Sequence, residues 1–283
     1  MVGVFVFFAG CGGGGSPPAR TPAPSAAPTA AAATRTPAPP PALCDGKLRV
    51  RVLGHATGPT ELSGLARSSD GTFWTHNDSG DGPRLFHLSK TGTVLGEVTL
   101  ANATAVDWED IAIRGRMLYV GDIGDNARQR PDIAVYRVLE GSSTAAKITL
   151  HYPDGPHDAE ALLVDPKTGS LTIVTKELTG SSGVYTGLKL RKAASLRLGL
   201  GQAVTGGDVS ADGRTIVLRT YTTAFVWRRR GSESLASAMQ RAPCAADADL
   251  LDEGQGEAIA LNPRGTAFYT IPEGANPALR RYS

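Results

Sequence analysis

The sequence predicts an all-β fold, a β-propeller of five four-stranded blades that is closed by a strand from the N-terminal side of the domain. Three observations lead to this prediction. A unit of about 48 residues recurs five times between residues 60 and 283, each copy holds several short strands, and the last copy lacks its fourth strand. A regular period of this length indicates a repeat architecture, and four antiparallel strands per unit are typical of a propeller blade.

Each repeat opens on a short acidic or small segment that runs into an apolar strand. At the third position of this segment the repeats carry Ser63, Glu109, Glu160, Gly207 and Glu257, at spacings of 46, 51, 47 and 50 residues. A tight turn follows, as at residues 69–71 and 211–213, where glycine supplies the positive φ that hairpin turns need. The next two strands are rich in β-branched and aromatic residues.

The ends of the domain predict how the ring closes. A fourth strand is expected in the first three repeats, at residues 94–98, 147–151 and 195–198, whereas the fifth repeat stops after its third strand. An extra strand at residues 47–53 precedes the first repeat, and pairing it with the last blade would remove an unpaired edge. Six blades are the alternative, with a degenerate blade in residues 189–206 or 228–254. One helix is expected at residues 233–240.

The chain divides into three parts by composition. Residues 1–11 are apolar and end in Phe-Ala-Gly-Cys, which resembles a bacterial lipobox with Cys11 as the lipidated residue; a chance apolar start is the alternative. This segment is too short to span a membrane. Residues 12–43 are rich in Gly, Pro, Ala, Ser and Thr and predict an extended linker. Residues 44–283 form the propeller domain.

Charge and cysteine content narrow the partners and the compartment. The formal net charge is +2, and no basic patch interleaved with aromatic residues indicates a nucleic-acid partner. Cys44 and Cys244 form an even pair that predicts a disulfide in an exported chain, with two buried thiols as the alternative. We expect a monomer, lipid-anchored at the outer face of the bacterial cytoplasmic membrane or secreted.

Propeller geometry predicts a site at one mouth of the central channel. The first strand of each blade starts on the face where the second strand ends, so polar residues at these points converge. The first strands contribute Glu61, Asp107, Glu109, Asp110, Asp158, Glu160, Asp208 and Glu257. The ends of the second strands contribute residues 76–78, 122–126, 176–177, 219–221 and Glu273. Carboxylates at this density repel each other unless they are protonated or neutralised by cations.

The chemistry of these residues favours Ca²⁺, because hard oxygen ligands with few histidines suit Ca²⁺ better than Zn²⁺. The predicted ligands are Asp107, Glu109, Asp122, Asp125, Asp158, Glu160 and Glu257. The alternative is that these carboxylates accept hydrogen bonds from backbone amides and hold the blades together. Lys176 and Arg219 are expected to hold an anionic substrate, and His157 is a candidate base. Nucleophile-elbow, P-loop and dinucleotide motifs are absent from the sequence.

Residues 61–64, 107–111, 121–126, 158–161, 219–221 and 256–258 resemble a family of secreted bacterial β-propeller lipoproteins, loosely related to phytase-like and gluconolactonase-like propellers. Phytase-like propellers are six-bladed, calcium-dependent phosphatases with an acidic channel mouth, whereas this sequence shows five repeats. Two functions stay open. One is a metal-dependent hydrolase of a small anionic phosphoester, ester or lactone. The other is a non-catalytic module that binds a small ligand or an envelope component and carries structural calcium.

Overall fold

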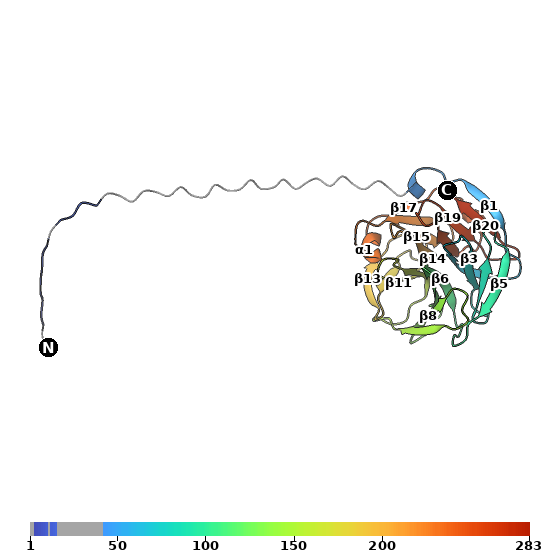
Figure 1. Ribbon diagram of the computed structural model, residues 1–283, viewed down its shortest axis with the longest axis horizontal. Helices are drawn as coiled ribbons and strands as arrows, with labels where there is room; N and C mark the ends of the chain where they lie inside the picture. Colours follow the sequence, from blue (N-terminus) through green and yellow to red (C-terminus); the bar gives the residue numbers. More distant parts are fainter. Residues whose placement is uncertain (1–2, 11, 16–41) are drawn as a thin grey trace. The chain divides into compact units, whose positions relative to one another are not determined.

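A computed structural model describes residues 3–10, 12–15 and 42–283, and residues 42–283 form a five-bladed β-propeller (Figure 1). The predicted fold class and blade number are confirmed, and the six-bladed alternative is wrong. The predicted lipidation site Cys11 and most of the predicted linker lie outside the described residues. Residues 3–10 and 12–15 contain no helix or strand. None of the helices in the described ranges has the length and apolar character needed to cross a membrane.

Each blade is a sheet of four antiparallel strands. Blade 1 contains β2 (Leu62–Arg67), β3 (Phe73–Asn77), β4 (Arg84–Leu88) and β5 (Val94–Thr99). Blade 2 contains β6 (Trp108–Arg114), β7 (Met117–Asp122), β8 (Ile133–Leu139) and β9 (Ala146–Leu150). Blade 3 contains β10 (Ala159–Val164), β11 (Leu171–Thr175), β12 (Gly183–Thr186) and β13 (Arg191–Ser195). Blade 4 contains β14 (Val204–Val209), β15 (Thr215–Thr220), β16 (Ala224–Arg228) and β17 (Cys244–Ala245). Blade 5 contains β18 (Ala258–Leu261), β19 (Phe268–Ile271), β20 (Ala278–Tyr282) and β1 (Val50–His55).

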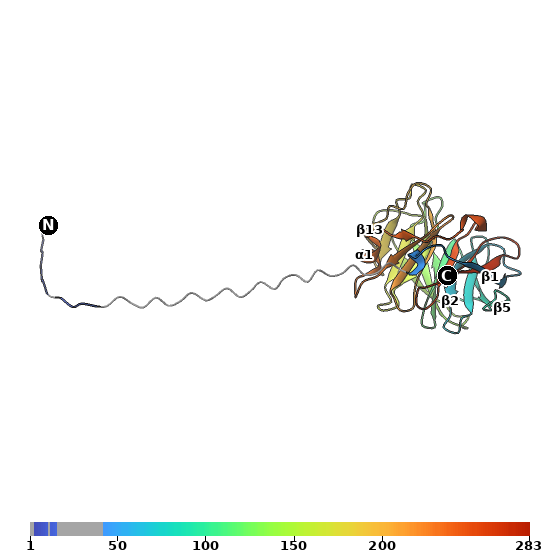
Figure 2. The ribbon, with the colours of Figure 1, turned by 90° about the horizontal axis from the view of Figure 1, so that it is seen from above.

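The first strand of every blade contacts the first strands of both neighbouring blades, so β2, β6, β10, β14 and β18 surround the channel (Figure 1). Seen from its side, the domain has strands running between two loop-bearing faces (Figure 2). Burial falls from the channel to the rim: β10 and β15 are buried along their whole length, whereas β5 and β9 are mostly exposed. This gradient explains why the inner strands are apolar and the outer strands carry charges.

Apolar side chains pack between each pair of neighbouring blades. Trp74 and Trp108 lie in the cluster between blades 1 and 2, and Trp227 lies in the cluster between blades 3 and 4. The predicted helix is confirmed as α1 (Leu235–Met239), with Ser234 as its N-cap. This short helix packs on β12, β13 and β16, so it fills the outer part of the interface between blades 3 and 4.

The ring closes as the sequence predicts. Strand β1 pairs antiparallel with β20, from Val50 opposite Tyr282 to His55 opposite Ala278, and completes the last blade. The residues that lead into β1 are held at the rim of blade 4. Cys44, at the end of the 3-10 helix η1 (Ala42–Cys44), is joined by a disulfide to Cys244 of β17, with their Cα atoms 6.1 Å apart.

Two outer strands differ from the sequence-based expectation. The outer strand of blade 3 is β13, which begins at Arg191 and not at residue 195, because Gly187 adopts a φ of 93° and ends β12 early. Blade 4 has a fourth strand that the sequence did not reveal. It is the two-residue β17, which follows α1 and lacks the apolar alternation of a full strand.

In the fourth repeat, the residue equivalent to those of the other blades differs from the one that the sequence predicts. The amide that closes each hairpin is that of Ser68 in blade 1, Asp165 in blade 3, Ser210 in blade 4 and Asn262 in blade 5. In blades 1, 3 and 5 this amide lies five residues after Ser63, Glu160 and Glu257. The same count in blade 4 leads to Thr205, so the predicted equivalent residue, Gly207, is wrong by two residues. The reason is that residues 205–208 contain two glycines and offer no apolar marker for the register.

The disulfide closes a loop of 200 residues, so its reduction is expected to destabilise the propeller. The chain-entropy model gives about 4–5 kcal/mol for a loop of this length. The measurement is the free energy of unfolding of the oxidised protein and of a Cys44→Ser/Cys244→Ser variant. Thiol titration of the denatured, unreduced protein is the control, and two free thiols per propeller would contradict the assignment.

Candidate functional site

A repeated backbone hydrogen bond defines one mouth of the channel. In four blades a residue one or two positions after the second strand donates its amide proton to the carbonyl of a residue one to three positions before the first strand. The four bonds are Asp78 to Glu61 at 2.7 Å, Gly124 to Asp107 at 3.1 Å, Lys176 to Asp158 at 3.0 Å and Glu273 to Gln255 at 3.0 Å. Each bond places two chain positions side by side at the same end of the channel, as the propeller geometry predicts.

Seven carboxylates from four blades meet at this mouth. They form three groups in which the ligand oxygens all lie within 4.8 Å of one another. The groups are Asp78 with Asp107 and Glu109, Glu109 with Asp158 and Glu160, and Asp78 with Glu257 and Glu273. Five of the seven predicted metal ligands are therefore brought together. We call these seven residues the acidic mouth.

Two of the deepest carboxylates sit at irregular points of their strands. The pairing of β6 with β7 shifts register between Trp108 and Asp110, and the pairing of β10 with β11 shifts between Ala159 and Ala161. Glu109 and Glu160 are thus the extra residues of two β-bulges. Bulges re-aim side chains and are common beside functional sites. Both glutamates are nevertheless only 2% exposed.

Burial and mutual repulsion raise the pKa values of the acidic mouth. Burial first, then the charges of Asp78 and Asp158, raise the pKa of Asp107 to about 6. Burial, then Glu257 and Asp78, raise the pKa of Glu273 to about 7. Burial and then Glu160 raise the pKa of Glu109, and burial and then Glu257 raise the pKa of Glu160, both well above their usual range. Burial and repulsion thus favour protonated carboxyl groups, and a bound cation would favour their ionised form.

One cation belongs to the acidic mouth. The Lys176 ammonium donates to Glu160 and, at 3.1 Å, to the Tyr221 hydroxyl, which in turn donates to Glu257 at 3.2 Å. Burial opposes the charge of Lys176, but Glu160 outweighs it and raises the pKa of the ammonium. The ion pair with Glu160 therefore favours the protonated, positively charged form of Lys176.

The acidic mouth has spare ligand capacity. Glu160 and Glu257 each keep a second carboxylate oxygen that is buried and has no hydrogen-bond partner. Buried polar atoms are nearly always partnered, so an orphaned carboxylate oxygen calls for a ligand. The donor set is composed only of oxygens, in numbers and with a flexibility that suit Ca²⁺. The residues present therefore fit this cation.

Two predicted ligands hold a loop instead. Asp122 accepts hydrogen bonds from the amide of Asp107 and pairs with Arg130 at 2.9 Å. Asp125 accepts from the amides of Gln129 and Arg130 at 2.9 and 2.8 Å. Their oxygens shape the turn after β7, which brings Gly124 against the acidic mouth.

Arg219 and His157 lie away from the acidic mouth, so their positions do not support the predicted substrate roles. Arg219 is fully buried between blades 4 and 5, where it pairs with Glu253 at 2.7 Å and donates to the carbonyl of Ala258. Its near neighbour Gly256 leaves the space that the guanidinium fills.

His157 lies at the interface between blades 2 and 3, against Tyr152 and Tyr185. Its Nε2 lies 3.0 Å from Asp154 and 2.8 Å from the Tyr185 hydroxyl, and its ring packs edge-on against Tyr152. The adjacent Asp158 is in the acidic mouth, where it accepts from the amide of Asp125. Consecutive residues of an extended chain point in opposite directions, so proximity in sequence did not place His157 at the site.

Two other aspartates accept hydrogen bonds from backbone amides and hold neighbouring blades together, which is the alternative role that the sequence left open. Asp110 accepts from the amide of Leu162 in the next blade at 2.8 Å, and Asp208 accepts from the amide of Leu261 at 2.7 Å. Burial raises the pKa of both, to about 7 for Asp208. These two residues fasten neighbouring inner strands and are not part of the acidic mouth.

The sequence-based ligand set omitted three residues of the site: Asp78, Glu273 and Tyr221. All three follow the end of a second strand, within the segments 76–78 and 219–221 or at position 273. That common place is the signal that identifies them, because the end of the second strand meets the start of the first.

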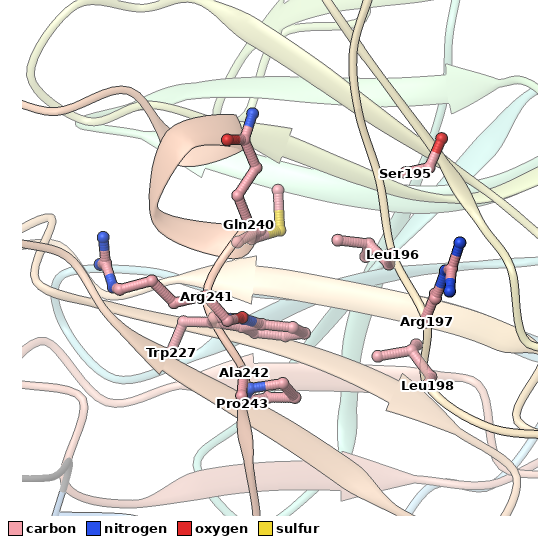
Figure 3. A pocket seen from close by; sticks show the side chains of 10 residues that line it. Ser195, Leu196, Arg197, Leu198, Trp227, Gln240, Arg241, Ala242 and Pro243 are labelled. Atoms are coloured by element: carbon pink, nitrogen blue, oxygen red, sulfur yellow. The ribbon is translucent and has the colours of Figure 1, made fainter.

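A separate cavity of about 250 Å³ lies at the outer side of blades 3 and 4 (Figure 3). Leu196 and Leu198 line it from the segment after β13, and Trp227 lines it from β16. None of its lining residues is acidic, so the cavity is not part of the acidic mouth.

The sequence matches no family model and no curated protein. A solved structure of a PQQ-bound aldose sugar dehydrogenase from Streptomyces coelicolor is similar, with a TM-score of 0.51 and 14% identity over 87% of this chain and 99% of that chain. A gluconolactonase from Xanthomonas campestris gives a TM-score of 0.49 and 13% identity, over 87% of this chain and 95% of that chain. At this level of identity the similarity shows the propeller fold and carries no activity to this chain.

The raised pKa values predict how the stability of the metal-free protein depends on pH. Asp107 and Glu273 have usual pKa values of 3.8 and 4.5 and folded values of about 6 and 7. The folded protein therefore holds protons that the unfolded chain releases. This contribution is full below about pH 4 and is lost as the pH rises through 6 to 7.

Urea unfolding in a chelating buffer between pH 4 and 8 measures this effect. An Asp107→Asn/Glu273→Gln variant should lose less stability than the wild type over this range. A wild type whose stability falls no more steeply than that of the variant would show that the two pKa values are not raised.

Proposed function

We propose that the acidic mouth binds Ca²⁺ and that this site hydrolyses a small ester or lactone that carries a negative charge. The observation that carries the proposal is the meeting of seven carboxylates from four blades, two of which keep unpartnered buried oxygens. Such a set is costly to bury without a counter-charge, and Lys176 supplies only one. A divalent cation would offset the remaining repulsion.

The ligand chemistry favours Ca²⁺ over other metals. The three groups contain no histidine or cysteine, which disfavours Zn²⁺ and the softer transition metals. Adjacent groups share Asp78 or Glu109, so the mouth offers more oxygens than the near-octahedral site that Mg²⁺ demands.

The depth of the residues suggests how a substrate would be held. Glu109, Glu160 and Glu257 are buried, whereas Asp78, Asp107 and Glu273 are partly exposed and so remain accessible from the solvent. A bound Ca²⁺ would polarise a carbonyl and lower the pKa of water. Lys176, with Tyr221 beside it, would hold the anionic group of the substrate. Because Arg219 is buried elsewhere, one cation remains for this task, which favours a singly charged ester or lactone over a phosphate.

A second candidate is a non-catalytic module with structural calcium. It is favoured by the origin of the ligands in blades 1, 2, 3 and 5, because a cation held by all of them would fasten the ring. In that case the mouth would bind a ligand or an envelope component without turnover. The lipid anchor at Cys11 and a place at the outer face of the membrane remain proposals from the sequence.

Calcium binding is expected to depend on Gly124. A Cβ at this position would overlap the carboxylates of Glu109 and Asp107, so Gly124→Ala should displace ligands while leaving the backbone in place. We expect a Kd for Ca²⁺ at least tenfold higher than that of the wild type. For the wild type, Ca²⁺ at a hundredfold excess over Kd should raise the free energy of unfolding by about 2.7 kcal/mol.

Gly82→Ala is the matched control. A Cβ at Gly82 meets no atom within 4 Å, and this glycine lies in the loop after β3 on the same face. Titration calorimetry and thermal melts with Ca²⁺ or a chelator measure both variants. Equal affinities for the two variants, or a wild type whose melt ignores Ca²⁺, would overturn the metal site.

Hydrolysis is expected to require the deep carboxylates. Glu109→Gln and Glu160→Gln should each lower kcat/KM by about a hundredfold or more on p-nitrophenyl esters or lactones, because each removes a charge that holds the cation. Lys176→Met should raise KM for anionic substrates more than for neutral ones. Glu97→Gln, on the exposed outer strand β5, is the matched control.

Activity that persists in Glu109→Gln and Glu160→Gln would show that the mouth is not the catalyst. Calcium binding without turnover of any ester, lactone or phosphate would support the non-catalytic candidate.

A further inference from the structure

The face opposite the acidic mouth is basic. It is formed by the turns that join the first and second strands of each blade, at residues 68–72, 114–117, 165–171, 210–215 and 262–268. Exposed cations occur on these turns in blades 2 to 5, and Lys90 of blade 1 lies against the turn at Gly71. We define the basic face by Lys90, Arg114, Arg116, Lys167, Arg214 and Arg264.

Contacts between neighbouring turns show that these cations share one surface. Arg114 of blade 2 donates to the carbonyl of Pro166 in blade 3, and Lys167 donates to that of Gly231 in blade 4, both at 3.2 Å. The amide of Asp212 in blade 4 donates to the carbonyl of Pro263 in blade 5, also at 3.2 Å. These contacts connect blades 2, 3, 4 and 5 on this side of the propeller, so their cations lie on one surface.

The cations of the two faces differ in how they are paired. On the mouth side, Arg84, Arg128 and Lys176 each contact a carboxylate. Of the six residues that define the basic face, only Arg116 has a carboxylate within 4.0 Å among the described residues, at 3.8 Å from Glu140, whereas the buried Arg229 on the same side is paired with Asp165. The exposed acids of that face, Asp70 and Asp212, accept hydrogen bonds within their own turns. These two aspartates keep their negative charges, but the six exposed cations outnumber them, so the basic face carries an excess of positive charge.

We propose that the basic face docks on the surface of an anionic lipid bilayer. Its turns are short and contain no exposed aromatic residue, since Phe268 is fully buried, so they lack the stacking side chains that single-stranded nucleic acid requires. Charges dispersed around a ring match a planar, fluid array of phosphates better than a narrow peptide. Lys and Arg close to such a surface each contribute to attraction, and the effect falls off within a Debye length.

Docking in this way orients the protein. The basic face and the acidic mouth lie at opposite ends of the channel, so the mouth would open away from the membrane. Repulsion between anionic lipid and the carboxylates of the mouth disfavours the reverse orientation. The inference does not depend on the proposed hydrolytic function, because none of the six residues that define the basic face belongs to the acidic mouth.

Vesicle sedimentation tests the proposal with residues 42–283, which contain all five sheets and the disulfide and lack the apolar N-terminal segment. A chelating buffer of low ionic strength keeps Ca²⁺ from bridging lipid and protein. We expect binding to vesicles that contain phosphatidylglycerol, none to vesicles of phosphatidylcholine alone, and release at high salt.

Two double variants distinguish an effect of the basic face from an effect of the net charge of the protein. Neither Arg214 nor Arg264 makes a side-chain hydrogen bond to another described residue, so Arg214→Gln/Arg264→Gln should fold normally and bind phosphatidylglycerol vesicles more than about tenfold more weakly. Arg128→Gln/Arg197→Gln removes the same charge away from the basic face and should bind like the wild type. Equal loss in both variants, no binding to anionic vesicles at low salt, or tighter binding to DNA than to the vesicles would overturn the proposal.

Discussion

Closure of the ring is the constraint on which the rest of this protein depends. Five inner strands surround the channel only because β1, from the start of the domain, completes the blade that the end of the chain leaves with three strands. The disulfide between Cys44 and Cys244 holds the segment before β1 against blade 4. An open ring would leave two sheet edges and one apolar interface exposed, and it would also disperse the seven carboxylates that closure brings together.

Repulsion between the carboxylates of the acidic mouth destabilises the fold, and it is the main evidence that the mouth is a functional site. Burial of like charges raises the pKa values of the acidic mouth, while Lys176 and Tyr221 offset part of the repulsion. Packing between every pair of blades stabilises the fold enough to tolerate the repulsion between these buried carboxylates. Binding of a cation would offset this repulsion, so occupancy of the proposed calcium site would raise the stability of the fold.

Neighbouring residues on the inner strands have different tasks. Glu109 enters the acidic mouth through a bulge, whereas Asp110 turns away and fastens β6 to β10. The two faces of the ring also carry residues of different kinds. Carboxylates gather where first strands begin, and cations gather on the turns where first strands end. The two faces therefore differ in the sign of the charge that they present.

By itself the sequence determined the propeller, its five blades, the closing strand and the convergence of acids at one mouth, because these follow from a regular repeat and from strand direction. It did not determine which way each side chain points. Arg219 and His157 lie within or beside strands that reach the mouth, but they turn into blade interfaces, and Thr205 replaces Gly207 in the ring. Bulges, the twist of each sheet and the space left by residues such as Gly256 decided these orientations, and they arise only from packing between blades that are distant in sequence.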